Sequence, residues 1–384
     1  MSARLVPRAV VAVLMLVLLT TSLAAPAAAA PPPVAPELAA KLQARVDQWR
    51  VNHRAPGVAV AVRLPDGSRW LGASGRAIRG ANGREVKVYT PFAVASLTKT
   101  FMAALILQLR DEGRLWLGTR ISRWLPNWPQ ADRITVKMLL NHRSGIRDYF
   151  AHPRYEKKVF GRPKHRWTTR EILALVGPRV CAPGKCYHYS NSNYVLLNKI
   201  VRVVTGRSAA SEIRRRFLEP LGLDDTYWQG RESIRKVPAE GYWWMGKGYR
   251  RFADGSRLRP NTSAATVAHA AGALLSSARD ISDWQDALLG GELLKPKSME
   301  LMLALHPKSR YGLGMRRAWL DGKPGVGHGG SLRGFVSVMY RLPEADLDVV
   351  IMTNLGRTSL QGLVDKLTRV TLNHLATSEP SPKP

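Results

Sequence analysis

The chain has 384 residues, of which 45% are hydrophobic, and it carries a formal net charge of +30. The length and the hydrophobic content are normal for a globular chain with one large domain, or a domain with a sizeable insertion. The charge would favour a nucleic-acid partner only in a protein that stays in the cytosol, and the N-terminal segment argues against that.

Residues 1–29 have the layout of a secretory signal peptide. A basic start precedes the apolar run Ala9–Leu19, and the small residues of Ala24–Ala30 follow. Cleavage after Ala29 fits the small-x-small rule. The alternative is an uncleaved membrane anchor, but the run is shorter than the ~20 residues that a spanning helix needs. No later segment is long and apolar enough to span a membrane, so we expect a secreted, extracytoplasmic protein.

Export changes the partners expected for the positive charge. Anionic wall polymers or membrane surfaces would complement it, whereas nucleic acid is not expected. The alternative is a solvated arginine-rich surface without a partner, because the charges are scattered along the chain rather than gathered in one arm.

A Pro-rich leader at residues 30–36 precedes a domain that we expect to span residues 37–376. Apolar spacing and capping residues predict its helices, and β-branched runs bounded by turns predict its strands. In chain order we expect a helix over Glu37–His53, a hairpin of Gly57–Leu64 with Trp70–Gly72, helices over Leu97–Leu109 and Val136–Leu140, a helix begun by a Thr168–Glu171 capping box, helices over Ser192–Val204, Glu212–Leu221 and Asp280–Leu289 with Asp280 as N-cap, strands over Tyr311–Trp319, Gly334–Arg341 and Leu347–Thr353, and a helix over Leu360–Leu375. Residues 228–262, rich in Gly, Arg and aromatic residues, are interpreted as an insertion or flap, and residues 377–384 as a disordered tail.

The expected strands lie at the two ends of the domain and the helices in its middle. This order favours an α/β (α+β) fold, in which one antiparallel sheet is built from both termini and flanked by helices, beside a mostly helical lobe. No internal repeat or linker divides the domain.

Cys181 and Cys186 are the two cysteines of the chain, five positions apart. In an exported protein this spacing favours a local disulfide that closes a small loop. The alternative is two free thiols. A metal site is disfavoured, because two cysteines alone do not complete a tetrahedral shell.

Ser96-Leu97-Thr98-Lys99 places a hydroxyl and an amine three residues apart at the start of a long apolar run. On a helix these positions share a face, so a desolvated Lys99 can take the proton of Ser96 and activate it as a nucleophile. The pattern is weak alone, because Ser233-Ile234-Arg235-Lys236 also fits it. The second copy lies in a charged stretch without an apolar helix, and we therefore favour Ser96.

Two later segments offer further groups for acyl chemistry. Tyr189-Ser190-Asn191 follows the cysteine loop, and Gly327-His328-Gly329-Gly330 leads into the expected strand from residue 334. A tyrosine beside the Lys99 ammonium is expected to have a depressed pKa and to shuttle protons. Asn191 offers an amide to the substrate or to Lys99, and glycines on a strand let a substrate approach closely. Singly, each of these residues also has an ordinary explanation in packing or turn formation.

In this order and at these separations, three motifs resemble those of the serine β-lactamase and D-alanyl-D-alanine carboxypeptidase family, in its class C-like branch. They are Ser96-x-x-Lys99, Tyr189-x-Asn191 and His328-x-Gly330. Residues 139–146 (LLNHRSGI) and 271–280 (AGALLSSARD) also resemble the family's LLxHTSGL and AGGLxSTxxD stretches. The resemblance runs from about Val46 to Leu375. It implies a β-lactamase/transpeptidase-like fold and no metal or organic cofactor.

The resemblance also implies a role for each matching residue. Ser96 would form the acyl-enzyme, Lys99 would act as base or electrostatic partner, and Tyr189 would share the proton transfers. The backbone N–H groups of Ser96 and Ser331 would form the oxyanion hole. The implied substrate-binding residues are Asn191, which would also contact Lys99, and His328, Gly329, Gly330 and Ser331.

The third motif departs from the family at Gly329, where a threonine usually helps to hold a substrate carboxylate. Its absence argues against strong β-lactamase activity and efficient carboxypeptidase action. Arg333 is a candidate for an alternative carboxylate anchor through a bidentate pair, unless it is a solvated surface arginine.

The expected export and the family motifs lead us to expect an exported serine hydrolase that acts through an acyl-enzyme, first of all a D-alanyl-D-alanine carboxypeptidase on peptidoglycan stem peptides. The alternatives are a β-lactamase or a carboxylesterase on the same scaffold, or a non-catalytic wall-binding or penicillin-binding protein. A hydrolase with a GxSxG elbow and a zinc protease with HExxH are excluded, because the chain has neither motif.

Overall fold

A seven-stranded antiparallel sheet joins the N-terminal and C-terminal parts of the domain in the computed structural model, which describes residues 32–252 and 262–378. The strand order is β3-β2-β1-β12-β11-β10-β9. The strands are β1 (Gly57–Arg63), β2 (Arg69–Ile78), β3 (Arg84–Glu85), β9 (Arg316–Leu320), β10 (Lys323–Leu332), β11 (Phe335–Leu342) and β12 (Leu347–Thr353). At the centre, β1 pairs with β12, with Val58 opposite Thr353. The prediction of one antiparallel sheet built from both ends of the chain is confirmed.

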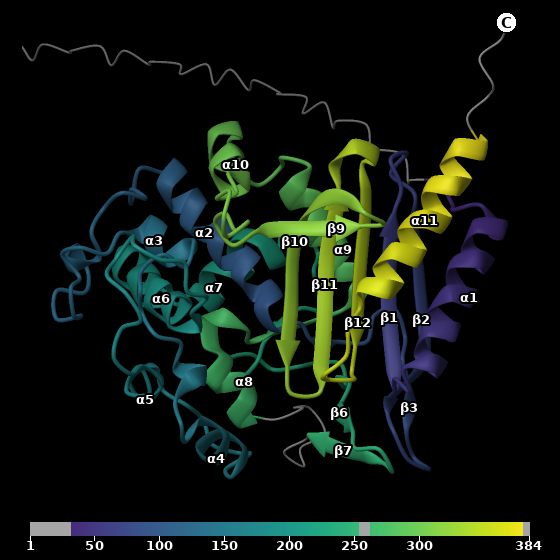
Figure 1. Ribbon diagram of the computed structural model, residues 1–384, viewed down its shortest axis with the longest axis horizontal. Coiled ribbons are helices and arrows are strands. Elements are labelled where there is room, and N and C mark those ends of the chain that lie inside the picture. Colours follow the sequence, from purple (N-terminus) through teal and green to yellow (C-terminus); the bar gives the residue numbers. More distant parts are fainter. Residues whose placement is uncertain (1–31, 253–261, 379–384) are drawn as a thin grey trace, which may run out of the picture. The chain divides into compact units, whose positions relative to one another are not determined.

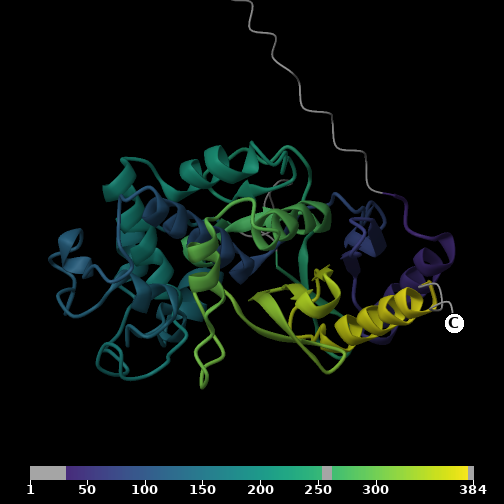
Figure 2. The same ribbon diagram turned by 90° about the horizontal axis from the view of Figure 1, so that it is seen from above.

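Helices cover both faces of this sheet (Figure 1). On one face, α1 (Pro36–Asn52) and α11 (Gln361–Ser378) lie side by side, as Figure 2 also shows. On the other face lie α2 (Thr98–Asp111) and α9 (Ala278–Leu289). Because side chains alternate along a strand, Val58, Val60 and Val62 enter the core under α1 and α11, while Ala59 and Ala61 enter the core on the α2 side.

A mostly helical lobe lies beside the sheet (Figure 1). Its helices are α3 (Val136–Leu140), α4 (Tyr155–Phe160), α5 (Thr169–Leu173), α6 (Asn191–Thr205), α7 (Ala209–Ile213), which continues into a π-helical turn at Arg214–Leu218, α8 (Thr262–Ala268) and α10 (Pro296–Leu303). The described residues also contain two small sheets. One consists of β4 (Phe92–Ala93), β8 (Leu274–Ser276) and β5 (Tyr227–Trp228), and the other of β6 (Gly241–Trp244) and β7 (Tyr249–Phe252).

Several predicted boundaries were wrong for local reasons. The segment Gly327–Gly330 lies inside strand β10 rather than in a turn that leads to the next strand. Strand β9 begins only at Arg316, five residues after the predicted start. Ser277, not Asp280, caps α9, because its side chain accepts a hydrogen bond from the Asp280 backbone N–H. The capping box that begins α5 is present as predicted.

Some sequence predictions fall on residues that are not described. These are the signal peptide at residues 1–29, residues 253–261 of the 228–262 segment, and residues 379–384 of the tail. The described part of the 228–262 segment contains the β6–β7 hairpin. Helix α11 extends to Ser378, just beyond the predicted start of the tail at residue 377.

Candidate active site

Ser96 lies in a 3₁₀ turn, Ala95–Leu97, that runs directly into helix α2. The preceding residue, Ala95, has a φ of 49°, in the left-handed region that residues other than glycine rarely adopt. Gly272 packs against the backbone of Ala95, since a Cβ on this glycine would lie 3.4 Å from the Ala95 carbonyl carbon. A constrained turn therefore positions the nucleophile at the start of a helix that is buried along most of its length.

The amine of Lys99 is completely buried and lies beside Ser96, as the spacing predicted. Its Nζ is 2.9 Å from Ser96 Oγ, 2.9 Å from Asn191 Oδ1 and 2.7 Å from the carbonyl oxygen of Ala271. Burial lowers the pKa of Lys99 to about 7, against an opposing influence of the Asp148 carboxylate. A neutral amine has two N–H groups, which can donate to Asn191 Oδ1 and to the Ala271 carbonyl oxygen. Its lone pair is then free to accept the hydrogen bond of the Ser96 hydroxyl.

Tyr189 also lies beside Ser96. Its hydroxyl lies 3.0 Å from Ser96 Oγ and donates a hydrogen bond to it, and its ring packs against His142 with a centroid distance of 4.2 Å. The predicted depression of its pKa was wrong. Burial raises the pKa of Tyr189 well above its usual value, and this effect outweighs the hydrogen bond to Ser96, which lowers it. Tyr189 is therefore a neutral phenol in the resting site and can act as a proton donor.

Asn191 is the first residue of α6, and its amide is held between Lys99 and a carboxylate that the sequence analysis missed. Asp148 Oδ2 accepts a hydrogen bond of 2.9 Å from Asn191 Nδ2, which leaves Oδ1 of the amide directed at Lys99. Burial raises the pKa of Asp148, while its hydrogen bonds and the Lys99 charge lower it. No pattern at fixed spacing marked Asp148. The only signal was its position two residues after the stretch that ends at Ile146.

His328 lies on β10 and lines the site, but both of its ring nitrogens bond to protein atoms. Nδ1 is 2.6 Å from the Gly329 carbonyl oxygen, and Nε2 is 2.9 Å from the Tyr311 hydroxyl. Burial lowers the pKa of His328 to about 3, so the ring is neutral at ordinary pH. Nδ1 therefore carries the proton donated to Gly329, and Nε2 accepts from Tyr311. These bonds fix the ring against a tyrosine cluster beside Ser96, which consists of Tyr187, Tyr189 and Tyr311.

The edge of β10 borders the pocket where the third motif lies. Pairing with β9 ends at Gly327, which is opposite Arg316, whereas pairing with β11 continues to Leu332. Three of the predicted substrate-binding residues, His328, Gly329 and Ser331, line the pocket, and their role in binding stays a prediction. Gly330 packs beneath the nucleophile turn instead, since a Cβ there would lie 2.2 Å from the carbonyl oxygen of Val94.

Arg333 does not lie in this pocket, which argues against its predicted role as a carboxylate anchor. The β10–β11 turn carries it away, and its guanidinium packs on the rings of Phe160 at 3.9 Å and Trp243 at 4.5 Å and pairs with Glu156. The arginine that does line the pocket is Arg316, at the start of β9. The sequence analysis missed it because only the sheet pairing brings Arg316 next to the third motif.

The residues around Ser96 enclose a pocket of about 310 Å³. Ser96, Tyr189, Asn191 and Arg316 line it together. Arg316 is opposite Gly327 in the sheet, and the next residues of β10, His328 and Gly329, also line the pocket. Phe150 and Leu332 add apolar walls. Within the described ranges no group of His, Cys, Asp and Glu side chains is arranged to hold a metal ion.

Two other sequence features lie outside the pocket. Cys181 and Cys186 form a disulfide, as predicted, and its loop packs on the segment that precedes Asp148 through a hydrogen bond from the Gly184 N–H to the Arg143 carbonyl. In the second Ser-x-x-Lys match, Lys236 pairs with Asp225 at 2.5 Å and lines a different cleft.

Comparison with known proteins places the chain in a family. The family model "Beta-lactamase" matches residues 38–370. Penicillin-binding protein 4 of Amycolatopsis lactamdurans is 30% identical over 83% of this chain and 85% of its own length.

Two solved structures are similar over most of the chain. A D-amino acid amidase from Ochrobactrum anthropi SV3, complexed with L-phenylalanine, is 28% identical over 90% of this chain and 100% of its own, with a TM-score of 0.76. A D-stereospecific amidohydrolase from a Streptomyces species is 30% identical over 83% of this chain and 94% of its own, with a TM-score of 0.70. The family match and the fold together show that this chain belongs to the Beta-lactamase family and is a serine hydrolase related to penicillin-binding proteins.

Proposed function

We propose that this protein is a D-alanyl-D-alanine carboxypeptidase that cleaves peptidoglycan stem peptides through an acyl-enzyme on Ser96. The observation that carries the proposal is the placement of Ser96 Oγ between a buried amine at 2.9 Å and a neutral phenol at 3.0 Å, in a pocket that also holds an arginine. A nucleophile needs a base to take its proton, and a leaving amine needs an acid, and these two neighbours meet both needs.

In acylation, neutral Lys99 takes the proton of Ser96 while Oγ attacks the carbonyl carbon of the scissile amide. The negative oxygen of the tetrahedral intermediate is held by the backbone N–H groups of Ser96 and Ser331. The C–N bond then breaks, and the leaving amine takes a proton from the Tyr189 hydroxyl. The proton that Lys99 took then passes to the Tyr189 phenolate, since both groups lie within 3.0 Å of Ser96 Oγ, which is now an ester oxygen and carries no proton. Water cleaves the ester by the same steps in reverse and releases the acid.

Arg316 supports a substrate with a free carboxylate. It is an exposed guanidinium at the wall of the pocket, and the motif threonine that would otherwise assist is replaced by Gly329. Arginine binds carboxylates through two parallel hydrogen bonds. We expect the C-terminal D-alanine carboxylate to pair with Arg316, which lines the same pocket as Ser96.

The second candidate is a D-amino acid amidase, favoured by the similarity to the O. anthropi and Streptomyces structures. Such a substrate ends in an amide instead of a carboxylate and makes no demand on Arg316. A β-lactamase or a carboxylesterase on the same scaffold would likewise use Ser96, Lys99 and Tyr189.

The experiment that separates these activities compares four substrates on one enzyme preparation. They are a diacyl-Lys-D-Ala-D-Ala peptide, a D-phenylalanine amide, nitrocefin and a short nitrophenyl ester. The carboxypeptidase proposal expects the peptide to have the highest kcat/KM, and it expects Arg316→Gln to raise the KM for the peptide while leaving amide hydrolysis nearly unchanged. Turnover of the amide or ester without the peptide would assign the function to that activity instead.

The covalent step has its own test. A fluorescent penicillin should add to wild type, as seen by intact mass, and not to Ser96→Ala. Ser233→Ala is the matched control, because Ser233 occupies the second Ser-x-x-Lys match and lies outside the pocket. A Ser96→Ala protein that is labelled like wild type would rule out the acyl-enzyme, and an unlabelled, inactive wild type would favour a non-catalytic binding protein.

We also propose that the protein is exported, on the basis of the layout of residues 1–29. Within the described ranges, no helix has the length and hydropathy to cross a membrane. Expression of the full chain in a secreting bacterial host should yield extracytoplasmic protein that begins at Ala30. Protein that keeps Met1 and remains in the cytosol would contradict the proposal.

A further inference from the structure

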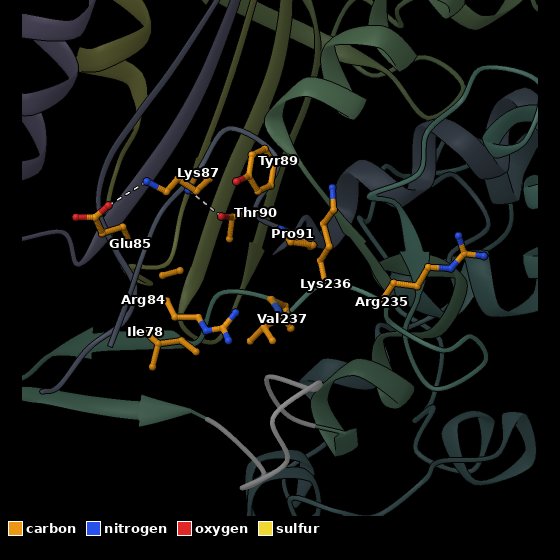
Figure 3. A pocket seen from close by; sticks show the side chains of 12 residues that line it. Ile78, Arg84, Glu85, Lys87, Tyr89, Thr90, Pro91, Arg235, Lys236 and Val237 are labelled. Atoms are coloured by element: carbon orange, nitrogen blue, oxygen red, sulfur yellow. Dashed lines mark hydrogen bonds and ion pairs between the residues drawn. The ribbon is translucent and has the colours of Figure 1, made fainter. Parts of the chain in front are cut away.

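A second cleft, of about 550 Å³, shares no lining residue with the catalytic pocket (Figure 3). It lies between the end of β2, strand β3, the segment 87–91 and the segment 235–238. The segment 87–91 leads into β4 and on to the nucleophile turn, and the Ala239 N–H donates to the Pro91 carbonyl, which ties the two walls together. The cleft is therefore part of the folded domain.

The charged residues that line this cleft are strongly biased toward cations. Arg84, Lys87, Arg235 and Lys236 face a single lining carboxylate, Glu85. Glu85 pairs with Lys87 at 3.0 Å, and Lys236 pairs with Asp225 outside the cleft at 2.5 Å. Among the described residues, neither Arg84 nor Arg235 has a carboxylate partner. Two guanidiniums are thus available to a ligand on a protein whose net charge is +30.

The cationic surface is longer than one small anion. In Figure 3, the side chain of Arg84 reaches toward Val237, whereas the guanidinium of Arg235 points away from the other labelled side chains, at the edge of the cleft. A neighbouring cleft of about 610 Å³ shares Glu85, Lys87 and Tyr89 with the first, and its additional charged residues are Arg76 and Asp47. The excess of cations lies in the first cleft, and Arg76 adds a cation on the other side of the segment 85–89. Cations spread over this distance suit a chain of anionic groups better than a single ion.

Tyr89 gives this surface an apolar contact beside its charges. Its side chain is 47% exposed, and the Lys236 ammonium lies 4.8 Å from the ring centroid. An exposed ring beside a cation can pack against the uncharged backbone of a bound polymer while the cation contacts its charged group.

We propose that this cleft is a second binding site, which holds a linear polyanion whose repeating units carry a phosphate or a carboxylate. Guanidinium groups bind both kinds of anion through paired hydrogen bonds. The site would hold the enzyme on an anionic polymer while the catalytic pocket stays open to its substrate. This proposal does not depend on which amide or ester Ser96 attacks.

The test measures the binding of a fluorescently labelled inorganic polyphosphate to the full-length protein by anisotropy at physiological salt. The double variant Arg84→Glu/Arg235→Glu should bind roughly tenfold more weakly or worse. The matched control is Arg133→Glu/Arg202→Glu, which makes the same change in net charge at two exposed arginines that line neither cleft. It should bind within about twofold of wild type, because exposed charges beyond a Debye length are screened.

Equal weakening in the two double variants, or wild-type binding by Arg84→Glu/Arg235→Glu, would overturn the site. Arg84→Gln/Arg235→Gln removes the charges without adding carboxylates and should also weaken binding.

Labelling of Ser96 by penicillin should be unchanged in these variants, and it reports that they are folded. Competition by polyphosphate and by poly-glutamate distinguishes phosphate from carboxylate as the preferred group, and stronger competition by a DNA oligonucleotide of equal charge would contradict the proposal.

Discussion

Asp148 accepts two hydrogen bonds from Asn191, one from the side-chain amide at 2.9 Å and one from the backbone N–H at 3.3 Å. The first fixes which way the amide faces, because a carboxylate can only accept and must therefore meet the NH₂ group. The amide oxygen is then directed at Lys99 Nζ, 2.9 Å away. A carboxylate that touches neither Ser96 nor the pocket surface thus sets the position of the base.

We expect Asp148→Ala to lower kcat/KM by up to about a hundredfold, because a loosened Asn191 no longer holds Lys99 beside Ser96. Asp148→Asn should retain much more activity, since its amide oxygen can still accept from Asn191. Stopped-flow acylation by penicillin measures both variants. Equal rates in wild type and Asp148→Ala would show that Asp148 does not position the amide.

The pH dependence of acylation should follow the protonation of Lys99. Burial lowers the pKa of Lys99 to about 7, so the neutral amine predominates above that pH and the rate should rise through pH 7 and then level off. Asp148→Asn removes the nearby negative charge that raises the pKa of Lys99, so the midpoint of its profile should move to lower pH. Lys99→Arg keeps the charge but cannot lose its proton in this range, and it should be inactive throughout. A wild-type midpoint near 10 would contradict this account.

The Tyr189 hydroxyl should matter far more than its ring. Tyr189→Phe keeps the packing against His142 but loses the donor 3.0 Å from Ser96 Oγ, and we expect kcat to fall by roughly 10²–10⁴. Tyr187→Phe is the matched control, because Tyr187 is part of the same tyrosine cluster and no hydrogen bond joins it to Ser96. Similar losses in the two variants would indicate a packing effect instead of proton transfer.

The sequence predicted the residues of this site where local spacing determines their geometry. Ser96 and Lys99 occupy neighbouring turns at the start of one helix, and Asn191 opens another, so short motifs identify them. The antiparallel sheet was likewise predictable from the β-branched runs at both ends of the chain.

The residues that were missed or misjudged depend on tertiary contacts. Asp148 reaches Asn191 from 43 positions away, and Arg316 reaches the pocket only through the register of β9 with β10. Arg333 is close to His328 in sequence, yet the turn after β10 carries it to Phe160 and Trp243. The pKa of Tyr189 was misjudged because the degree of burial, which outweighs the nearby charge, cannot be read from a motif.

The two adjacent glycines of the third motif should differ sharply in what they tolerate. A Cβ on Gly330 would lie 2.2 Å from the Val94 carbonyl oxygen and 2.5 Å from Ser337 Oγ, which themselves form a hydrogen bond of 2.9 Å. Gly330→Ala must separate these groups and shift the turn that leads to Ser96. It should cost about 1–3 kcal/mol in free energy of unfolding and lower the rate of acylation.

Gly329→Ala is the matched control, because its nearest atom would be the Tyr340 hydroxyl at 3.4 Å, an ordinary contact. Its free energy of unfolding should stay within about 1 kcal/mol of wild type. Urea denaturation followed by tryptophan fluorescence measures both variants. If Gly330→Ala is as stable as Gly329→Ala, the close approach of β10 to the nucleophile turn does not constrain this position.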